Sequence, residues 1–358
     1  MLRDSFGRVI DYLRVSVTDR CNFRCVYCMP DDGYPVSPKD ELLTYEEILR
    51  VVKVACELGI KKVRLTGGEP LIRKDLPLLL KEIKEQTKTE DLSCTTNGFL
   101  LPEMAQALKE SGLDRVNISL DTLDKEKFVK IARRGSLDKV LDGVKAAEDA
   151  GLEPIKINCV LMKGFNDDEV VDFAKMSIEK NYHIRFIELM PIRWNMDDTD
   201  SFTPLSELAN GKGLIQIRTS KDAGMLSDSQ MRKMLVTAEE SFDKLSDYFG
   251  ELIPTEIITN GPARTYKIKD ARGTVGFITQ ISNDFCVKCN RLRLTADGQL
   301  RPCLMSDGEV DLRTPLRNGE SDDFIKNLFL HVVKHKPERH YLAEGQKVHG
   351  RTMSQIGG

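Results

Sequence analysis

The sequence contains no long hydrophobic run, no secretion signal and no strong net charge. None of its apolar runs reaches the ~18 residues of a membrane-spanning helix. The N-terminal segment, MLRDSFGRVIDY, has early acidic residues and lacks the apolar core of a signal peptide. A formal net charge of −3 provides no general basic field for nucleic acid. These absences argue against a membrane, secreted or nucleic-acid-binding protein and predict a cytoplasmic one.

The composition is that of an ordinary globular protein, with 41% hydrophobic and 30% charged residues. The 358 residues can form one large domain or two. The chain has no internal repeat and no low-complexity segment. Because its overall charge is slightly acidic, an anionic ligand would need a local pocket of basic side chains.

The nine cysteines divide into two groups of three and three single residues. Short spacings in a chain without a secretion signal indicate metal ligands rather than disulfides, and a reducing compartment follows. The single cysteines stand in apolar helix or strand patterns and are predicted to be buried small hydrophobic residues. The first group is Cys21, Cys25 and Cys28, the second is Cys286, Cys289 and Cys303, and the single residues are Cys56, Cys94 and Cys159.

The first group has the spacing C-x3-C-x2-C within CNFRCVYC. Three thiolates on one tight loop can bind three irons of a 4Fe–4S cluster and leave the fourth iron open to a ligand. A structural zinc site is the alternative, but zinc usually takes four ligands. Because no fourth Cys or His stands nearby in the sequence, the cluster with an open iron is preferred.

The second group combines the C-x2-C pair Cys286 and Cys289 with Cys303, on the far side of a hairpin turn predicted from TADGQ. Taken alone, this group fits zinc as well as a cluster. Beside the first loop, a second three-cysteine 4Fe–4S cluster is favoured. Arg291 and Arg293 share one face of the strand that follows, so they predict an anion site next to this cluster.

Strands and helices alternate in the first half of the chain. Six βα units predict a parallel sheet with helices on its outer face. Six strands are too few for a closed eight-stranded barrel, so we expect an α/β fold with an open, partial TIM-type (βα)6 barrel. The predicted strands are 12–18, 62–67, 92–97, 115–121, 154–161 and 183–190, and the predicted helices are 44–58, 76–86, 102–111, 124–133, 136–150 and 167–180.

One face of each predicted strand is polar, although buried parallel strands should be continuously apolar. One interpretation is that this polar face meets solvent, as it would at the edge of a sheet. Because helices are expected to cover the other face of the sheet, a cavity lined by these side chains is the preferred interpretation. They are Arg14, Ser16 and Thr18; Arg64 and Thr66; Ser93, Thr95 and Asn97; Asn117, Ser119 and Asp121; Lys156 and Asn158; Glu188 and Met190.

The pattern changes after the six units. We predict a barrel domain over 1–192, a long polar and helical linker over 193–253, and a β-rich C-terminal region over 254–358 that carries the second cluster. The linker contains a helical run near 226–246. The C-terminal region has predicted strands near 264–270, 274–280, 291–296 and 299–304 and a charged helix near 309–334.

The cysteine loop CNFRCVYC, with Tyr27 before its last cysteine, resembles the cluster loop of radical S-adenosylmethionine enzymes. This resemblance implies that the open iron chelates S-adenosylmethionine, whose reductive cleavage releases a 5′-deoxyadenosyl radical. TGGEP at 66–70 is a second match, to the segment that holds the methionine end of the cofactor in that superfamily.

The longer motifs resemble the GTP 3′,8-cyclase family of molybdenum cofactor biosynthesis over residues 4–192 and 254–358. The family implies a lyase for the first step of molybdopterin formation. The radical removes the ribose 3′ hydrogen of GTP, carbon 3′ attacks carbon 8 of guanine, and reduction gives (8S)-3′,8-cyclo-7,8-dihydroguanosine 5′-triphosphate. The matching motifs are FGRxxxYLRxSxTxRCNFRCxYCMP, TGGEPL, TTNG, NISLDTL, IKINCV, ELMP, FCxxCNRLRLTADGxLRPCL and the Gly-Gly terminus.

The family resemblance also implies the roles of individual residues. The two cysteine groups bind two 4Fe–4S clusters, and the first cleaves S-adenosylmethionine. The contacts to S-adenosylmethionine come from Tyr27, Gly68, Ser119 and Met190. The contacts to GTP come from Arg14, Arg64, Thr95, Lys156, Arg291, Leu292 and Arg293. The residues expected to act in catalysis are Cys21, Cys25, Cys28, Arg291, Arg293 and the terminal Gly357 and Gly358, which enter the active site.

Several alternatives stay open on the sequence. The segment from roughly 193 to 240 is longer than the family linker. The Gly-Gly end is compatible with a frayed terminus. A radical S-adenosylmethionine enzyme that matures a peptide shares the first loop and TGGEP, and a zinc-stabilised binding module shares the cysteines. The family further implies an electron donor and a cyclic pyranopterin monophosphate synthase that receives the product, and a homodimer is compatible with the sequence.

Overall fold

The computed structural model describes residues 1–190, 226, 228–256, 261–283, 285–344 and 351–357. Its strands are β1 (Leu2–Arg3), β2 (Val9–Ile10), β3 (Tyr12–Ser16), β4 (Lys62–Thr66), β5 (Asp91–Thr96), β6 (Arg115–Ser119), β7 (Ile155–Leu161), β8 (Tyr182–Glu188), β9 (Ile253–Thr255), β10 (Arg264–Lys267), β11 (Thr274–Ile278), β12 (Arg291–Leu294), β13 (Gln299–Arg301) and β14 (Val310–Asp311). Its α-helices are α1 (Tyr45–Glu57), α2 (Leu76–Gln86), α3 (Leu101–Glu110), α4 (Lys125–Ala132), α5 (Leu137–Asp149), α6 (Val170–Glu179), α8 (Asp228–Lys233), α9 (Ala238–Phe249), α10 (Arg313–Arg317) and α11 (Asp322–Lys334).

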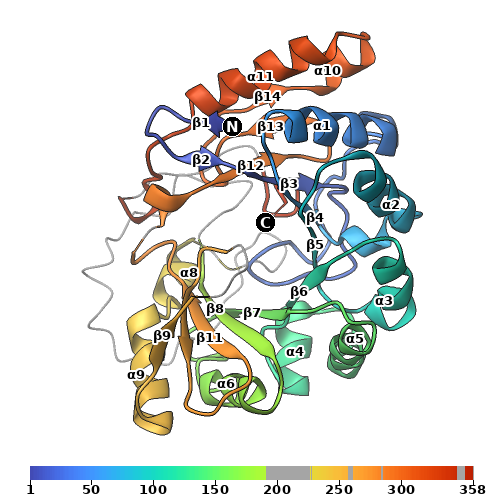
Figure 1. Cartoon of the computed structure of the whole chain (residues 1–358). Coiled ribbons are helices and arrows are strands. Elements are labelled where there is room, and N and C mark those ends of the chain that lie inside the picture. The colour runs from blue at the N-terminus through green and yellow to red at the C-terminus, as the bar shows by residue number, and fades with distance from the viewer. Residues whose placement is uncertain (191–225, 227, 257–260, 284, 345–350, 358) are drawn as a thin grey trace.

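One large sheet organises these elements. Its order is β14-β13-β12-β3-β4-β5-β6-β7-β8-β11-β10-β9. The strands from β12 through β3–β8 to β11 run parallel, whereas β13, β14, β10 and β9 pair antiparallel at the two edges. Helices α1–α6 lie outside the curved sheet (Figure 1). The prediction of six βα units forming an open barrel is therefore confirmed.

The C-terminal strands occupy a place that the sequence did not predict. They are β-rich as expected, but β12 pairs with β3 and β11 pairs with β8, at opposite ends of the six-stranded barrel. An unpaired edge strand offers a row of free backbone donors and acceptors, and these two pairings satisfy both rows. The region that carries the second cysteine group is thus part of the barrel wall. Residues 193–225 and 227 of the predicted linker lie outside the described part of the chain.

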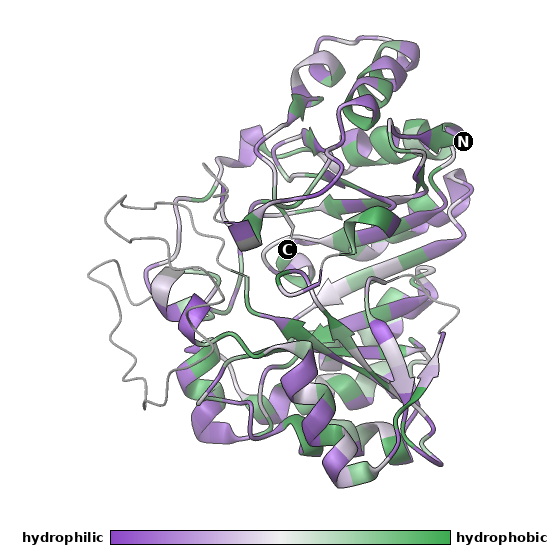
Figure 2. Ribbon diagram, turned by 90° about the vertical axis from the view of Figure 1, so that its left-hand side faces the viewer, coloured by the Kyte–Doolittle hydropathy of each residue, from purple (hydrophilic) through white to green (hydrophobic). Residues whose placement is uncertain are grey.

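The hydrophobic core lies between the outer face of the sheet and the helices. Leu13 and Val15 of β3 and Val63 and Leu65 of β4 are fully buried on this face. The helices expose one side and bury the other, and Figure 2 accordingly shows hydrophilic and hydrophobic residues on the peripheral helices. Apolar side chains therefore face outward from the barrel, and the inward face of each strand is left for polar groups.

Two predicted helices are each divided in the structure. The helix expected over 309–334 is β14 followed by α10 and α11, because Gly319 has φ +76° and the Ser321 side chain caps α11. The run expected over 226–246 is α8 and α9. Thr237 interrupts it, since it forms a capping box with Glu240 that begins α9.

The predicted environment of the single cysteines is confirmed for Cys94 and Cys159, which are fully buried. Cys56 is only partly buried and packs against the edge of the core. Among the described residues, no helix combines the length and the apolar character needed to cross a membrane.

Candidate active site

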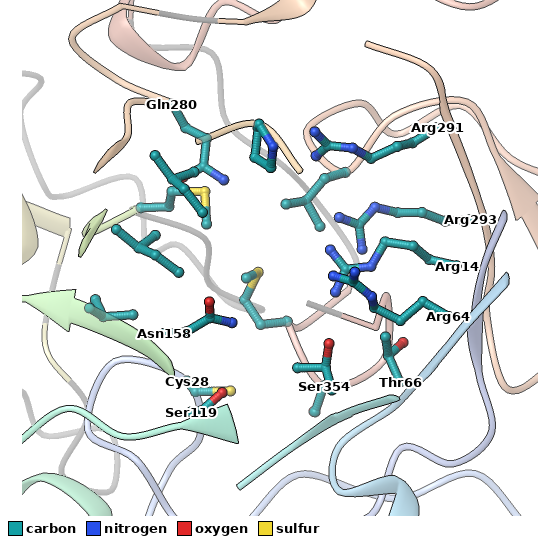
Figure 3. Close-up of a pocket in the computed structure, with 18 of the residues that line it drawn as sticks. Arg14, Cys28, Arg64, Thr66, Ser119, Asn158, Gln280, Arg291, Arg293 and Ser354 are labelled. Carbon is teal, nitrogen blue, oxygen red and sulfur yellow. The ribbon is translucent and has the colours of Figure 1, made fainter. Parts of the chain in front are cut away.

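A cavity of about 280 Å³ lies inside the barrel, at the carboxyl ends of its strands. It brings together most of the residues predicted for the site, from both halves of the chain. Figure 3 shows a column of arginines on one side of this cavity, with Asn158 and Gln280 across from it. The predicted residues that line it are Arg14, Cys21, Cys25, Tyr27, Cys28, Arg64, Gly68, Thr95, Ser119, Met190, Cys286, Cys289, Arg291, Arg293 and Cys303.

Three of the described residues that were predicted for the site do not line the cavity. Lys156 is buried, with 2% of its surface exposed. The Leu292 side chain lies in the hydrophobic core on the opposite face of β12, so a contact to a ligand in the cavity would have to come from its backbone. Gly357 is buried close to the cavity wall, and Gly358 lies outside the described residues.

Three arginines stand side by side on neighbouring parallel strands. Arg14 of β3 is in register with Arg293 of β12 on one side and with Arg64 of β4 on the other. Neighbouring strands are about 5 Å apart, so three guanidinium groups lie in one row. Like charges placed directly opposite one another on a sheet are destabilising unless an anion neutralises them. This row therefore indicates a site for a strongly anionic ligand.

Burial and mutual repulsion lower the pKa of these guanidinium groups. The pKa of Arg293 falls to about 10, first because it is buried and then because Arg291 is nearby. Burial followed by the charge of Arg293 lowers the pKa of Arg14 well below its ordinary value. Each lowered pKa indicates that the charged form of the guanidinium is destabilised when no anionic partner is present. An anion in the cavity would relieve this cost.

Arg185 joins the same group and was not singled out from the sequence. It lies on the inner face of β8 and is 4% exposed, and burial followed by the charge of Arg64 lowers its pKa to about 9. With its amide oxygen turned toward them, Asn117 accepts hydrogen bonds from Arg64 and Arg185. The alternation His183, Arg185, Ile187 was the signal that could have identified it.

Glu188 was assigned to the polar inner face, and that assignment is wrong. Its Oε2 accepts hydrogen bonds from the backbone N–H groups of Ile281 and Ser282, at 2.8 and 2.9 Å. The inner face of β8 carries Arg185 and Ile187 instead, since Glu188 has the parity of the core residues on this strand. Glu188 braces the loop that leads to the second cysteine group.

The first cysteine loop contains a backbone turn that presents its thiols to the cavity. The N–H groups of Cys28 and Met29 both donate to the carbonyl oxygen of Cys25, at 2.9 and 3.0 Å. The Phe23 N–H donates to Cys21 Sγ at 3.4 Å. Burial, followed by the negative charge of Glu69, raises the pKa of Cys21 to about 11. A positively charged partner such as iron would be needed to hold this thiol as a thiolate.

The glycines of TGGEP permit a close contact between two loops. The N–H of Gly68 donates to the carbonyl oxygen of Thr18 at 2.8 Å. A Cβ atom on Gly67 would lie 2.4 Å from that oxygen, and one on Gly68 would lie 2.2 Å from the carbonyl oxygen of Arg20. Only glycine fits both positions. The segment therefore packs directly against the backbone that enters the first cysteine loop.

Two buried carboxyl groups flank the first loop. Glu69 accepts hydrogen bonds from the Thr96 hydroxyl and the Asn97 N–H, each at 2.7 Å, and burial raises its pKa to about 7. Asp121 accepts a hydrogen bond from the Tyr27 hydroxyl at 2.7 Å, and burial raises its pKa to about 6. Together they provide hydrogen-bonding groups for a polar cofactor next to the thiols.

The second cysteine group lies in a cationic environment. Arg8 donates from Nη1 to the carbonyl oxygen of Cys286 at 2.8 Å, and Lys336 donates to that of Arg291 at 2.9 Å. Although burial opposes it, the charges of Lys336, Arg291 and Arg8 hold the pKa of Cys289 below its ordinary value. The Met305 N–H donates to Cys303 Sγ at 3.4 Å. These positive charges favour the thiolate form, which is the form that binds iron.

The donor set fits iron–sulfur clusters and a polar substrate. In the described part of the chain, no three His, Cys, Asp or Glu side chains are arranged around a single metal ion. Each cysteine group nevertheless offers three thiols to the same cavity, and thiolates are the ligands of 4Fe–4S clusters. Buried polar atoms without a hydrogen-bond partner include the Tyr12 hydroxyl, Thr95 Oγ1, Asn158 Oδ1 and Gln280 Oε1, which belong to residues lining the cavity.

The end of the chain enters this site. Arg293 donates a hydrogen bond to the carbonyl oxygen of Ile356 at 3.3 Å and another to that of Gly357. Gly357 has φ +66°, and a Cβ atom there would lie 2.4 Å from Thr66 Oγ1. Figures 1 and 2 place the C-terminal end in the interior of the molecule. Within residues 351–357, Met353 and Ser354 line the cavity and Ile356 and Gly357 are buried.

The chain is similar over its whole length to curated enzymes named GTP 3′,8-cyclase. It is 46% identical over 358 residues to the one from Pelotomaculum thermopropionicum, with 100% of both chains covered. It is 47% identical over 357 residues to the one from Heliobacterium modesticaldum, with 99% of both covered. Residues 15–177 match the model of the radical SAM superfamily, and residues 215–342 match that of Molybdenum Cofactor Synthesis C.

Solved structures share the fold at low sequence identity. Streptococcus suis SuiB bound to its precursor peptide SuiA gives a TM-score of 0.57 at 15% identity, covering 95% of this chain and 67% of that one. SuiB bound to S-adenosylmethionine gives 0.51 at 15% identity, covering 85% of this chain and 61% of that one. This likeness shows the fold alone. The full-length similarity to curated relatives settles the family: the chain belongs to the GTP 3′,8-cyclase family of the radical SAM superfamily.

Proposed function

We propose that this chain converts GTP to 3′,8-cyclo-7,8-dihydro-GTP in the cavity between its two cysteine groups. The observation that carries the proposal is the in-register row Arg293, Arg14 and Arg64, which lies in a cavity lined by three thiols from each group. Neither a zinc-stabilised module nor a peptide-modifying enzyme explains so many cations facing one cavity. A nucleoside triphosphate, with about four negative charges, does explain them.

The residues of the first loop are proposed to bind a 4Fe–4S cluster and S-adenosylmethionine. Cys21, Cys25 and Cys28 supply the thiolates, and the fourth iron is left for the cofactor. Once reduced, the bound pair supplies a 5′-deoxyadenosyl radical that can take a hydrogen atom from carbon 3′ of the ribose. The residues proposed to hold S-adenosylmethionine are Tyr27, Gly68, Ser119 and Met190, all of which line the cavity.

Arginines and one lysine are proposed to bind the triphosphate. Arg14, Arg64 and Arg293 present their row to the phosphates, and Arg185 of β8 adds a fourth guanidinium beside Arg64, with which it shares the acceptor Asn117. Lys156 lies deeper, and burial followed by the charge of Arg185 lowers its pKa to about 5. An anion reaching it would stabilise its charged form. Thr95 offers a hydroxyl group without a partner.

The guanine is proposed to lie at the second cysteine group. Cys286, Cys289 and Cys303 would hold the second 4Fe–4S cluster, with an iron open toward the base. Arg291 stacks over the Phe285 ring at 4.7 Å and lines the same part of the cavity. Leu292 would contribute through its backbone, since its side chain is in the core. The ribose then lies between the two clusters, within reach of the first.

The terminal Gly357 and Gly358 are proposed to act on the reacting nucleotide. Gly357 touches Thr66 and is held by Arg293, which also belongs to the phosphate row. The tail therefore shares a side chain with the proposed phosphate site, and its Met353 and Ser354 line the cavity.

The proposed partners follow from this chemistry. The clusters require an external electron donor, and the product is proposed to pass to a cyclic pyranopterin monophosphate synthase. We further propose a cytoplasmic location and a homodimer. The divisions at 192 and 253 are proposed as the limits of the barrel, linker and C-terminal regions.

The test is turnover of GTP by the anaerobically reconstituted protein with S-adenosylmethionine and a chemical reductant. We expect cyclised nucleotide and 5′-deoxyadenosine, and GTP deuterated at carbon 3′ should transfer deuterium to the deoxyadenosine. Protein with alanine at the three first-group cysteines is the control and should form neither compound. Abundant deoxyadenosine with no deuterium and no cyclised nucleotide would contradict the proposal and favour another substrate, such as a peptide.

A further inference from the structure

Arg351 holds the C-terminal tail at the point where residues 351–357 begin. Its Nη1 and Nη2 donate to Oδ1 and Oδ2 of Asp297, at 3.0 and 2.9 Å. Its Nε and Nη2 donate to Oε2 and Oε1 of Glu309, at 2.8 and 2.9 Å. One guanidinium thus makes paired contacts with two carboxylates, the arrangement that its planar donor fork allows and a lysine cannot reproduce.

Both carboxylates belong to the region that carries the second cysteine group. Asp297 lies in the turn between β12 and β13, where its Oδ1 also accepts from the Thr295 hydroxyl at 2.6 Å. Glu309 precedes β14 and is paired with Arg301, which is 1% exposed. The hairpin that positions Arg293 on one strand therefore also anchors the start of the tail at its turn.

The tail between these two anchors is a closed turn. The N–H groups of Gln355 and Ile356 both donate to the carbonyl oxygen of Thr352, at 3.1 Å. The Gln355 side chain in return accepts from the Thr352 N–H at 3.0 Å. Ile356 is 1% exposed and packs into the molecule. Because the turn is compact, a shift at residue 351 would move Gly357.

The contacts of Arg351 with Asp297 and Glu309 are called the clamp. Isolated surface ion pairs contribute little to stability, so the clamp has to be distinguished from such a pair. The Arg351 side chain is 16% exposed, and its two carboxylate partners are 21% and 29% exposed. Four hydrogen bonds in one network restrict the guanidinium far more than a single exposed contact does. Arg351 does not line the cavity, so any effect on the reaction has to act through the tail or through the hairpin turn that it contacts.

We propose that Arg351 is a positioning residue that sets how far the tail, residues 351–357, reaches into the active site. It clamps the tail to the turn of the β12–β13 hairpin, while Arg293 on the same hairpin receives its end. The tail is then preorganised before substrate enters. This inference rests on the proposed function, because it assumes that the tail takes part in cyclisation.

The test compares Arg351→Met with the wild-type holoenzyme. We expect cyclised nucleotide formation to fall about 10- to 100-fold, the effect of losing charge-assisted hydrogen bonds. Iron content and deoxyadenosine formation without GTP should not change, and backbone hydrogen exchange of the peptide that contains Ile356 and Gly357 should become faster. Arg317→Met is the matched control. Arg317 lies on α10, outside the tail, and pairs with Glu47 through two of its side-chain nitrogens, so this variant should change neither cyclisation nor the hydrogen exchange of the tail.

A second variant keeps the test independent of any folding defect in the first. Asp297→Asn weakens the same clamp, and the double variant with Arg351→Met should be no slower than the worse single variant. If the two single variants reduce cyclisation independently, so that their losses multiply in the double variant, the clamp is overturned. Normal cyclisation by Arg351→Met, with the tail still protected from hydrogen exchange, would overturn it as well. Wild-type protein that cannot cyclise GTP would overturn the proposed function instead, and in that case hydrogen exchange alone would decide the clamp.

Discussion

The Nη1 atom of Arg293 donates a hydrogen bond to the carbonyl oxygen of Gly357, so a strand next to the second cysteine group holds the end of the chain. The same arginine stands in register with Arg14 in the cationic row. One side chain therefore contacts the tail and faces the proposed phosphate site. Because Arg293 already holds the tail, a substrate whose phosphates bind Arg293 has to fit into the cavity together with the tail.

Replacing Arg291 and Arg293 by alanine should impair GTP turnover and leave cleavage of S-adenosylmethionine possible. Both guanidinium groups lie on β12, away from the first cysteine loop, and the loss of each charge-assisted contact should cost about 1.5–3 kcal/mol. The measurement is cyclised nucleotide against deoxyadenosine formed without GTP. Normal cyclisation by the double variant would show that the substrate lies elsewhere.

Gly357→Ala should abolish most cyclisation while the fold and both clusters persist. The added Cβ atom would meet Thr66 Oγ1 at 2.4 Å, and the φ of +66° disfavours a side chain as well. The double variant with Thr66→Ala removes the clashing oxygen and should recover part of the activity.

Removing Gly357 and Gly358 should reduce cyclisation at least as much as Gly357→Ala does. The fold should persist, because a terminal dipeptide buries too little surface to hold the fold together. An added alanine after Gly358 tests the position of the terminal carboxylate without removing either glycine. If the truncated enzyme forms both products at the normal rate, the tail has no catalytic role.

The two cysteine groups should bind their clusters independently. Alanine at Cys21, Cys25 and Cys28 should leave about four irons per chain, and alanine at the second group should do the same. The structure supports this expectation because the two groups are held by different loops of the cavity wall. Loss of all iron from either triple variant would argue against two separate sites.

The sequence was sufficient for the features that depend on local pattern. The alternation of strands and helices gave the barrel, and the period of two in β3, β4 and β6 placed Arg14, Arg64 and Ser119 on the inner face. Cysteine spacing gave both groups. These features follow from neighbours in the chain, so no knowledge of distant contacts was needed.

Other features depend on contacts between distant segments. No local pattern states that β12 pairs with β3 and β11 with β8, because strand order across an edge is decided by which edges remain unpaired. The row formed by Arg293 beside Arg14 follows from that pairing and could not be foreseen. The close approach of Gly67 to the backbone of Thr18 likewise cannot be predicted from the sequence, because it joins two segments that are far apart in the chain.

His183 should make the protein sensitive to acid. Its Nδ1 lies 2.8 Å from Thr274 Oγ1, and burial, followed by the charges of Lys156, Arg185 and Arg115, lowers its pKa from 6.5 to about 4. The folded protein therefore holds a neutral imidazole that the unfolded chain would protonate. The associated stability is present above pH 6.5 and is lost as the pH falls through 4.

His183→Gln should remove this dependence, since glutamine can keep a hydrogen bond to Thr274 and does not titrate. The measurement is thermal unfolding of the anaerobic holoenzyme between about pH 5.5 and 7.5, where one proton contributes at most about 1.4 kcal/mol per pH unit. His335→Gln, at an exposed histidine that follows α11, is the control and should retain the wild-type slope. Burial and the charge of Arg185 lower the pKa of Lys156 to about 5, below this window, and Lys156 is present in all three proteins, so the difference between slopes reports on His183. Equal slopes for wild type and His183→Gln would show that folding does not lower the pKa of His183, and the neighbouring cations and burial would then not disfavour its protonated form.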